Sequence, residues 1–228
     1  MKQPNPTRPN PTQPNIQACN GDWATKLICK NEQGSLAWWS VALFWPFLSG
    51  NVLVWYIKHC FRKEDIANEV AAGLWVGRYP LAIKSGDKRF LELIQKDLVC
   101  VVDLTVEFPL KTSFVGTAVY HSCPSLDRLM STPTALAKLA VNLLALRRSS
   151  SDGTKQAMYV HCANGHGRSA LVAAMVLIMN NECNDFEHAK VVMRENRPGI
   201  KWQQHQEAVA KCSLLEAQAS VKLVPANE

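Results

Sequence analysis

The sequence predicts an α/β fold with a mixed central sheet of about four to five strands flanked by helices. Short apolar runs of strand length alternate with longer Ala- and Leu-rich runs of helical length between residues 64 and 220. One short run, residues 98–104, is apolar almost throughout, which is typical of a central strand buried on both faces. Because strands and helices alternate along the chain, the helices are expected to pack on the faces of one sheet.

Residues 1–35 are predicted to form a polar, disordered tail. The first 15 residues contain five prolines, and apart from Met1 they contain no aliphatic or aromatic side chain. A segment of this composition cannot bury enough apolar surface to offset the conformational entropy that folding removes. We therefore expect the folded part of the chain to begin after it.

Residues 36–57 are predicted to form a transmembrane helix or a helical hairpin in the membrane. The stretch holds 22 residues without a charged side chain. As a helix it spans about 33 Å, close to the ~30 Å hydrocarbon core of a bilayer. Aromatic pairs near its two ends suit the two membrane interfaces. These pairs are Trp38 with Trp39 and Trp55 with Tyr56.

Two membrane topologies are compatible with residues 36–57. A straight helix gives a single pass, whereas Pro46 and Gly50 are residues at which the chain can turn back as a hairpin. Basic residues are denser in residues 58–63 than ahead of the helix, which favours a cytoplasmic location for the folded domain. The alternative to membrane anchorage is an apolar helix packed on the folded domain.

Charge and cysteine content argue against two other classes of partner. Residues 1–63 carry five of the six net positive charges, so the folded domain lacks the basic excess of a nucleic-acid-binding surface, and no nucleic-acid partner is expected. None of the eight cysteines forms a Cys-x-x-Cys pair, which argues against a zinc site. Their low density favours a reducing compartment. The oligomeric state is not indicated.

The folded domain is expected over residues 64–220, with a short tail over residues 221–228. Apolar periodicity and capping residues predict its elements in order. The strands are expected at residues 74–77, 98–104, 118–121 and 156–160, and the helices at residues 87–96, 133–148, 171–179, 185–196 and 202–218.

The most informative stretch, residues 160–170, lies between a predicted strand and a predicted helix. Cys162 and Arg168 stand six positions apart, with Gly165 and Gly167 between them. A glycine-containing loop that enters a helix directs its amide N–H groups at a bound anion, and the helix dipole adds partial positive charge. The sequence therefore predicts a phosphate-binding loop here.

The residue types of this loop suit attack on a phosphate ester. Near a helix N-terminus and cations the pKa of a thiol falls, so Cys162 becomes a nucleophilic thiolate. Arg168 can hold two phosphate oxygens at once. Ser169 can donate a hydrogen bond to the sulfur, and His161 can support the loop from outside. The predicted phosphate-binding residues are Cys162, Ala163, Asn164, Gly165, His166, Gly167 and Arg168.

The stretch resembles the His-Cys-x5-Arg-Ser/Thr signature loop of the protein tyrosine phosphatase superfamily, and most of all that of its dual-specificity branch. His161, Cys162, Gly165, Arg168 and Ser169 carry the match. The resemblance covers roughly residues 66–215. It implies a dual-specificity phosphatase-like fold and hydrolysis of phosphate monoesters through a cysteinyl-phosphate intermediate. No metal-ligand cluster is visible in the sequence, so no metal and no cofactor are expected.

Asp127 is the candidate general acid. It lies in the segment Pro124-Ser125-Leu126-Asp127 just after a predicted strand, and this pattern resembles the general-acid loop of dual-specificity phosphatases. A poor leaving group needs a proton on its departing oxygen, which a carboxyl group there can supply. The alternative is a surface Asp that caps the following helix. Asp103, at the end of a buried strand, is interpreted as structural.

Three functions stay open at this stage. The first is a dual-specificity protein phosphatase acting on phosphorylated proteins. The second is a membrane-associated lipid phosphatase acting on a phosphoinositide or phosphatidylglycerol phosphate, which the hydrophobic helix favours. His166 either raises affinity for such anionic substrates or points to solvent as a neutral side chain. The third is an inactive phosphate-binding module, which the joint presence of Cys162, Arg168, Ser169 and Asp127 disfavours.

Overall fold

The computed structural model describes the domain and the hydrophobic helix, together with parts of the segment before them. The prediction for residues 1–26, and most of the predicted helix at 87–96, lie outside the described residues. The described residues are 27–28, 30–31, 34–61, 64–81, 93, 98–109, 118–148 and 156–223.

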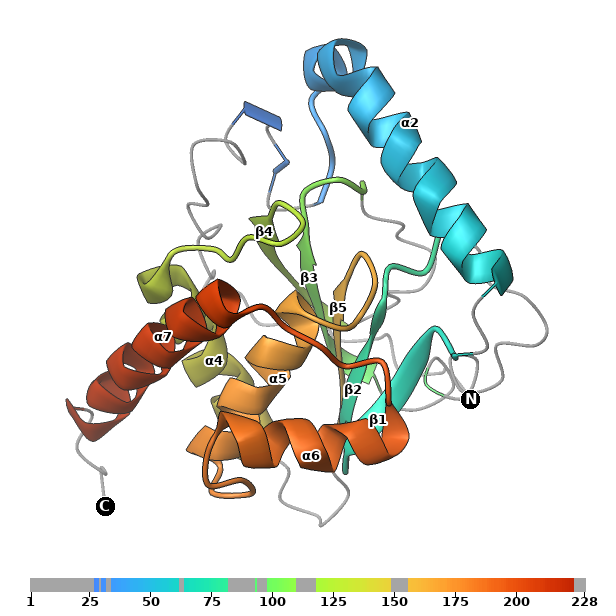
Figure 1. Cartoon of the computed structure of the whole chain (residues 1–228). Coiled ribbons are helices and arrows are strands. Elements are labelled where there is room, and N and C mark those ends of the chain that lie inside the picture. Colours follow the sequence, from blue (N-terminus) through green and yellow to red (C-terminus); the bar gives the residue numbers. More distant parts are fainter. Residues whose placement is uncertain are drawn as a thin grey trace, which may run out of the picture.

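A mixed sheet of five strands forms the centre of the domain, as predicted (Figure 1). The strand order is β1-β2-β5-β3-β4; β1 pairs antiparallel with β2, and the other neighbours are parallel. The prediction missed β1, because polar residues such as Asn68 and Glu69 interrupt its apolar pattern. The strands are β1 (Ala67–Ala71), β2 (Leu74–Arg78), β3 (Leu98–Thr105), β4 (Val119–Ser125) and β5 (Ala157–Cys162).

Four helices pack together with one face of the sheet (Figure 1). Every residue of the second of them is buried, which explains why its sequence is apolar from Ala170 to Met179 rather than amphipathic. The third begins after Asp185, whose side chain accepts a hydrogen bond from the His188 amide as an N-cap. The helices are α4 (Pro133–Arg148), α5 (Arg168–Met179), α6 (Phe186–Asn196) and α7 (Gln204–Leu223).

Alternation along β5 divides the core into two layers. Met158, Val160 and Cys162 belong to the cluster on the side of these helices, whereas Ala157 and Tyr159 belong to the cluster on the opposite face. This is the two-residue periodicity of a strand. It directs the Cys162 side chain toward the face that α5 covers.

The carboxyl ends of the four parallel strands gather at one edge of the sheet. These ends are Arg78, Cys162, Thr105 and Ser125. In open α/β sheets ligands bind at this edge, because the loops that follow the strands converge there. The loop at 163–167, between β5 and α5, lies at the same edge.

The segment before the hydrophobic helix is bound to the domain through Lys30. Its Nζ lies 2.6 Å from Asp103 Oδ2, and both side chains are fully buried. Burial by itself raises the pKa of Asp103, but Lys30, His161 and Thr105 outweigh this effect and lower it from 3.8 to about 2. Tyr120 also donates to this carboxylate. The interpretation of Asp103 as a structural residue agrees with these contacts.

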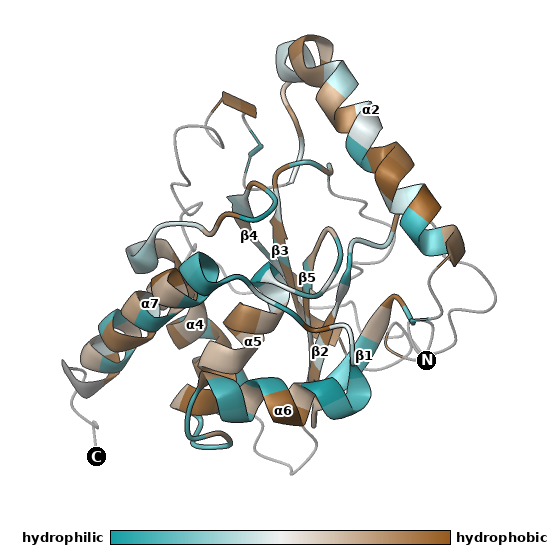
Figure 2. Ribbon diagram, in the orientation of Figure 1, coloured by the Kyte–Doolittle hydropathy of each residue, from teal (hydrophilic) through white to brown (hydrophobic). Residues whose placement is uncertain are grey.

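The predicted hydrophobic helix is present as α2 (Trp38–Phe61), which runs without a break through Pro46 and Gly50. Its buried residues are Ser40, Leu48, Trp55 and His59. Figure 2 shows apolar bands along much of the helix, which lies outside the layers of the core. Among the helices that the structure describes, α2 is the one that is long and apolar enough to cross a membrane.

We predict that Lys30→Ala destabilises the protein by about 3 kcal/mol at neutral pH, because it leaves a buried carboxylate without its cation. Lys138→Ala, on the exposed side of α4, is the matched control and should change the free energy of unfolding little. The pKa of Asp103 is lowered by folding, so its contribution is complete above pH 3.8 and is lost as the pH falls toward 2. Urea unfolding at several pH values measures this. An equal effect of both variants at neutral pH would show that the Lys30 pair is not stabilising.

Candidate active site

The loop between β5 and α5 turns tightly at Gly165. This residue has φ of +72°, and a Cβ there would lie 2.3 Å from the carbonyl carbon of Gly77 and 2.6 Å from the Arg78 amide nitrogen. Only glycine fits, because it has no Cβ and adopts positive φ without strain. The close approach brings the Gly165 amide toward Cys162.

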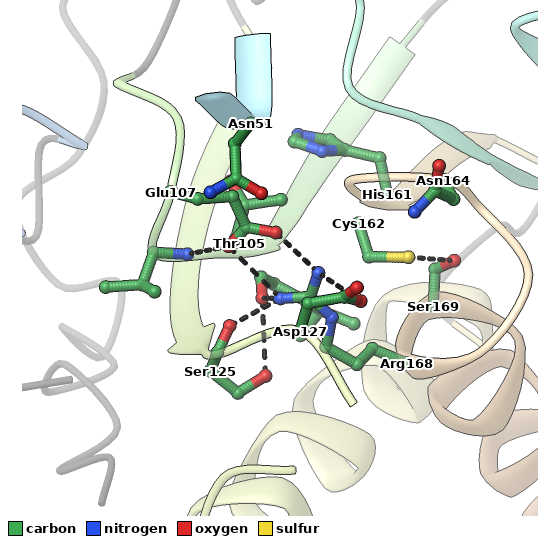
Figure 3. Close-up of polar contacts among 12 residues, drawn as sticks. Asn51, Thr105, Glu107, Ser125, Asp127, His161, Cys162, Asn164, Arg168 and Ser169 are labelled. Carbon is green, nitrogen blue, oxygen red and sulfur yellow. Dashed lines mark hydrogen bonds and ion pairs between the residues drawn. The ribbon is translucent and has the colours of Figure 1, made fainter. Parts of the chain in front are cut away.

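Cys162 sits at the bottom of this loop, with hydrogen-bond partners for its sulfur. The Gly165 N–H donates to Sγ over 3.2 Å, and Ser169 Oγ lies 3.4 Å from Sγ (Figure 3). Burial by itself raises the pKa of the Cys162 thiol, but the Arg168 charge and the Ser169 and Gly165 hydrogen bonds outweigh it, so the pKa is lowered. The sulfur is therefore in an environment that favours a thiolate.

Arg168 is the first residue of α5 and is almost completely buried. Its Nη2 lies 2.6 Å from Glu107 Oε1, and its Nη1 donates to the carbonyl oxygens of Leu104 (3.0 Å) and Ser125. Burial lowers the pKa of Arg168, but Glu107 and Cys162 outweigh that effect and raise it, so the guanidinium keeps its charge. Figure 3 shows these bonds converging on the guanidinium.

Glu107 is a site residue that the sequence prediction missed. It follows β3 and is almost completely buried, and it pairs with Arg168 across 61 positions of the chain. The one local signal in the sequence is that Glu107 follows an apolar strand. A carboxylate buried at such a position requires a cation beside it. Its partner is decided by the packing of β3 beside β5.

Asp127, the candidate general acid, lies beside the guanidinium of Arg168. Its Oδ1 is 3.4 Å from Arg168 Nη2, and its side chain is 55% exposed, so it faces the solvent side of the site. The helix α4 begins only at Pro133, so Asp127 does not cap it. Next to it, Arg128 adopts φ of +67°, rare for a residue with a side chain. His205 Nε2 lies 2.6 Å from the Arg128 carbonyl oxygen, which ties this loop to α7.

His161 lies in β5, directly before Cys162. It is fully buried between the rings of Tyr79 and Tyr159, with ring centroids 5.8 and 5.3 Å away. Its Nδ1 lies 3.9 Å from Asp103 Oδ1. Burial lowers the pKa of His161 to about 4 although Asp103 raises it, so the imidazole is neutral at physiological pH. The neutral ring therefore adds no charge behind the thiolate.

Arg197 is a second buried arginine that holds the loop from its outer side. Its Nε donates to the Gly165 carbonyl oxygen over 2.8 Å, and its Nη1 donates to Asn68 Oδ1 over 2.6 Å. Its Nη2 also donates to the Asn164 carbonyl oxygen. By binding carbonyl oxygens outside, Arg197 leaves amide groups of the loop to face inward. The sequence indicated a turn at 197–198 but not this role.

His166 does not point freely into solvent. Its Nε2 lies 2.5 Å from Glu64 Oε2, and its carbonyl oxygen accepts from the Lys201 amide over 3.0 Å. Burial by itself raises the pKa of Glu64, but His166 and Arg197 outweigh it and lower it from 4.5 to about 2. The contact between His166 and Glu64 secures one side of the loop to the segment before β1.

A cavity of about 290 Å³ opens above the loop. Cys162, Asp127 and Arg168 all line it, so the structure brings the three sequence-predicted residues to one space. Lys58 of α2 lines the same cavity, and its Nζ donates to Asn164 Oδ1 over 3.3 Å. The sequence placed Lys58 only as a basic residue that flanks the hydrophobic segment. The other lining residues are Arg128, Asn164, His166, Gly167, Gly199, Lys201, Gln203 and Gln206.

The fold and the loop define the class: a member of the dual-specificity branch of the protein tyrosine phosphatase superfamily. A family model described as "PTP-SAK: Swiss Army Knife protein, DSP-PTPase phosphatase domain" matches residues 74–220, and the chain belongs to this family. Its members are described as phosphatase domains, that is, hydrolases of phosphate esters. Curated protein sequences give no match.

Solved structures with the same fold include three phosphatase-like proteins. PTPMT1 in complex with PI(5)P is 21% identical, with a TM-score of 0.52, and the match covers 69% of this chain and 99% of that one. A variant of human DUSP28 is 19% identical, with a TM-score of 0.53, over 68% and 97% of the two chains. The human tyrosine phosphatase-like serine/threonine/tyrosine-interacting protein is 17% identical, with a TM-score of 0.52, over 71% and 99%. These likenesses show the fold.

We predict that Cys162 reacts with iodoacetate at a lower pH than an ordinary thiol, because its pKa is lowered. Ser169→Ala removes a hydrogen bond to the sulfur, so the midpoint of the alkylation–pH profile should move upward. Mass spectrometry of the Cys162 peptide measures this, and the exposed Cys212 in the same digest is the internal reference. An unchanged midpoint in Ser169→Ala would show that the hydroxyl does not stabilise the thiolate.

Proposed function

We propose that the protein hydrolyses phosphate monoesters through a cysteinyl-phosphate intermediate. The observation that carries the proposal is one cavity lined by a nucleophile, a cation and a carboxyl group: Cys162, Arg168 and Asp127. The sulfur lies in a setting that lowers its pKa, and the guanidinium lies at the same site. Family membership supports hydrolysis of phosphate esters.

In the first step the Cys162 thiolate attacks phosphorus, and the bond from phosphorus to the leaving oxygen breaks. Asp127, in its acid form, donates a proton to that oxygen. The three remaining phosphate oxygens are held by the Arg168 guanidinium and by amide groups of the loop at 163–167. These donors are fixed before the substrate binds. Glu107 holds the Arg168 guanidinium, and Arg197 holds the loop through the Gly165 carbonyl oxygen.

In the second step the Asp127 carboxylate takes a proton from a water molecule, whose oxygen attacks phosphorus. The bond between sulfur and phosphorus breaks, and sulfur leaves as a thiolate stabilised by Ser169 Oγ, 3.4 Å away. Inorganic phosphate departs, and Asp127 again holds its proton. The cycle therefore returns each group to its starting state.

Phosphorylated protein and phospholipid headgroup are the two substrate classes proposed for this site. The dual-specificity type of domain supports the first. Two observations support the second: Lys58 reaches the cavity from the apolar helix, and a protein of the same fold, PTPMT1, has been solved with PI(5)P. A cytoplasmic location of the catalytic domain is compatible with both substrate classes. A reducing compartment of this kind also keeps the Cys162 thiol free to act as a nucleophile.

We predict that Cys162→Ser and Arg168→Ala abolish hydrolysis of a small aryl phosphate while circular dichroism shows a retained fold. Asp127→Asn should lower kcat by about 10²–10⁴-fold for an alkyl phosphate and by less for an aryl phosphate, because aryl oxides leave without a full proton. Vanadate should inhibit the wild type, and EDTA should not. Full activity of Cys162→Ser, or inactivation by EDTA alone, would refute the cysteinyl mechanism. Absence of any wild-type turnover would leave the phosphate-binding module.

We predict that Lys58→Gln lowers kcat/KM for a vesicle-borne phosphatidylglycerol phosphate or phosphoinositide by roughly tenfold, because it removes a cation from the cavity. The loss for a phosphopeptide should be smaller. Lys138→Gln on α4 is the matched control for general loss of positive charge. A substrate panel on the wild type and both variants measures this. An equal loss for lipid and peptide would show that Lys58 does not select the lipid.

A further inference from the structure

The two ends of α2 are bound to the same catalytic domain. Ahead of the helix, Lys30 Nζ lies 2.6 Å from Asp103 Oδ2 at the end of β3, with both side chains fully buried. At the start of the helix, Ser40 Oγ donates to the Ile28 carbonyl oxygen over 2.6 Å. Toward its end, Lys58 donates to Asn164 of the phosphate-binding loop. The helix is therefore held from both sides.

These contacts cannot coexist with a helix that crosses a bilayer. The 24 residues of α2 span about 36 Å, more than the ~30 Å hydrocarbon core. A crossing would place Lys30 on the side of the membrane opposite to Asp103. The buried ion pair would then be broken, and the Asp103 carboxylate would stay buried without its cation.

The outer surface of α2 is apolar and lacks a protein partner among the residues that the structure describes. Only 17% of its most apolar window is buried. The exposed side chains include Trp38 (82%), Leu43 (66%), Leu53 (61%) and Phe61 (84%). An exposed apolar surface of this extent marks a site of contact with a membrane or a protein.

A lipid bilayer suits this surface better than a protein partner does. Residues 36–57 hold no charged side chain that would match a protein surface, and Trp38, Trp39 and Trp45 are the side chains favoured at a membrane interface. Lys58, Arg62 and Lys63 follow the apolar run directly. Basic residues directly beside an apolar helix are attracted to anionic lipid headgroups.

We propose that α2 lies in the plane of the bilayer surface, with the segment before it and the catalytic domain on the same side of the membrane. Its stripe of buried residues rests on the protein, and its remaining surface enters the lipid. The helix thus binds one leaflet rather than crossing the membrane.

This arrangement places the cavity at the membrane surface. Trp55 of α2 packs with Tyr79, Phe108 and Ala163, which follow directly or closely on β2, β3 and β5. The helix therefore crosses the carboxyl edge of the sheet, where the cavity opens, and contributes Lys58 to its lining. Resting on the proposed function, the substrate is a phosphate monoester on a phospholipid headgroup.

The topology is tested with the full chain carrying one epitope tag at each terminus, in sealed membrane vesicles treated with protease. Both tags should be cleaved together or protected together. If both are protected, adding detergent should make both of them accessible to the protease. Protection of one tag while the other is cleaved would overturn the proposal, because it requires a crossing helix. The Cys162→Ser variant should give the same pattern, so the result does not depend on catalysis.

The lipid-binding surface is tested by sedimentation with vesicles of phosphatidylcholine and phosphatidylglycerol. Leu53→Lys, on the outer surface of α2, should weaken vesicle binding by roughly tenfold or more. Leu215→Lys, on the exposed side of α7 and 67% exposed, is the matched control and should bind as the wild type does. Equal binding by both variants, or a wild type that stays in the supernatant, would overturn the proposal.

The two hypotheses fail in different ways. Suppose that both tags lie on one side, that vesicles are bound, and that a phosphopeptide is hydrolysed but the lipid phosphate is not. The membrane-binding role of α2 is then supported, and the lipid substrate is refuted. If neither phosphate is hydrolysed, the proposed function is refuted while the topology result still stands.

Discussion

The buried ion pair between Arg168 and Glu107 is the contact on which the geometry of the site depends. Arg168 is the first residue of α5, and Glu107 follows β3, so their 2.6 Å contact joins the helix to the carboxyl edge of the sheet. Two buried charges lose the hydration that water provides, and the pair persists only because each satisfies the other. With Leu104 and Ser125 also accepting from the guanidinium, its plane is fixed beside the Cys162 sulfur.

Main-chain constraints complete this geometry around the sulfur. No side chain fits at Gly165, because a Cβ there would lie 2.3 Å from the Gly77 carbonyl carbon. Gly77 is constrained by a different neighbour, because a Cβ there would lie 2.4 Å from the Ile66 carbonyl oxygen. Arg197 binds the outward-facing carbonyl oxygens at 164 and 165. Burial by itself raises the pKa of Cys162, but the Arg168 charge and the hydrogen bonds from Ser169 and Gly165 to the sulfur outweigh it and lower the pKa.

The hydrophobic helix is connected to this core more closely than a simple anchor would be. Trp55 packs over residues that follow three strands, and Lys58 enters the cavity. The pair of Lys30 with Asp103 lies behind His161, so the segment before the helix also touches the support of the loop. The apolar helix and the loop at 163–167 therefore share a set of packed residues.

The fold class, most strands and helices, and the glycine-containing loop between β5 and α5 could be predicted from the sequence. Each rests on a local signal: apolar periodicity for β3, β5 and α5, glycine spacing for the loop at 163–167, and a carboxyl group after a strand for Asp127. Such signals suffice where neighbours in the chain decide the structure. Local signals fail for β1, because its polar residues interrupt the apolar pattern of a strand. This strand is stabilised by its pairing with β2.

The contacts between residues far apart in the sequence could not be predicted, because they depend on how the chain packs. Glu107 pairs with Arg168, Arg197 holds the loop, and Lys58 reaches the cavity, although 106 positions separate Lys58 from Asn164. These contacts follow from the strand order and from the position of α2 on the domain. Neither of these can be predicted from the sequence around Glu107, Arg197 or Lys58. A buried charge reveals that it needs a partner, but the packing of the chain alone chooses which one.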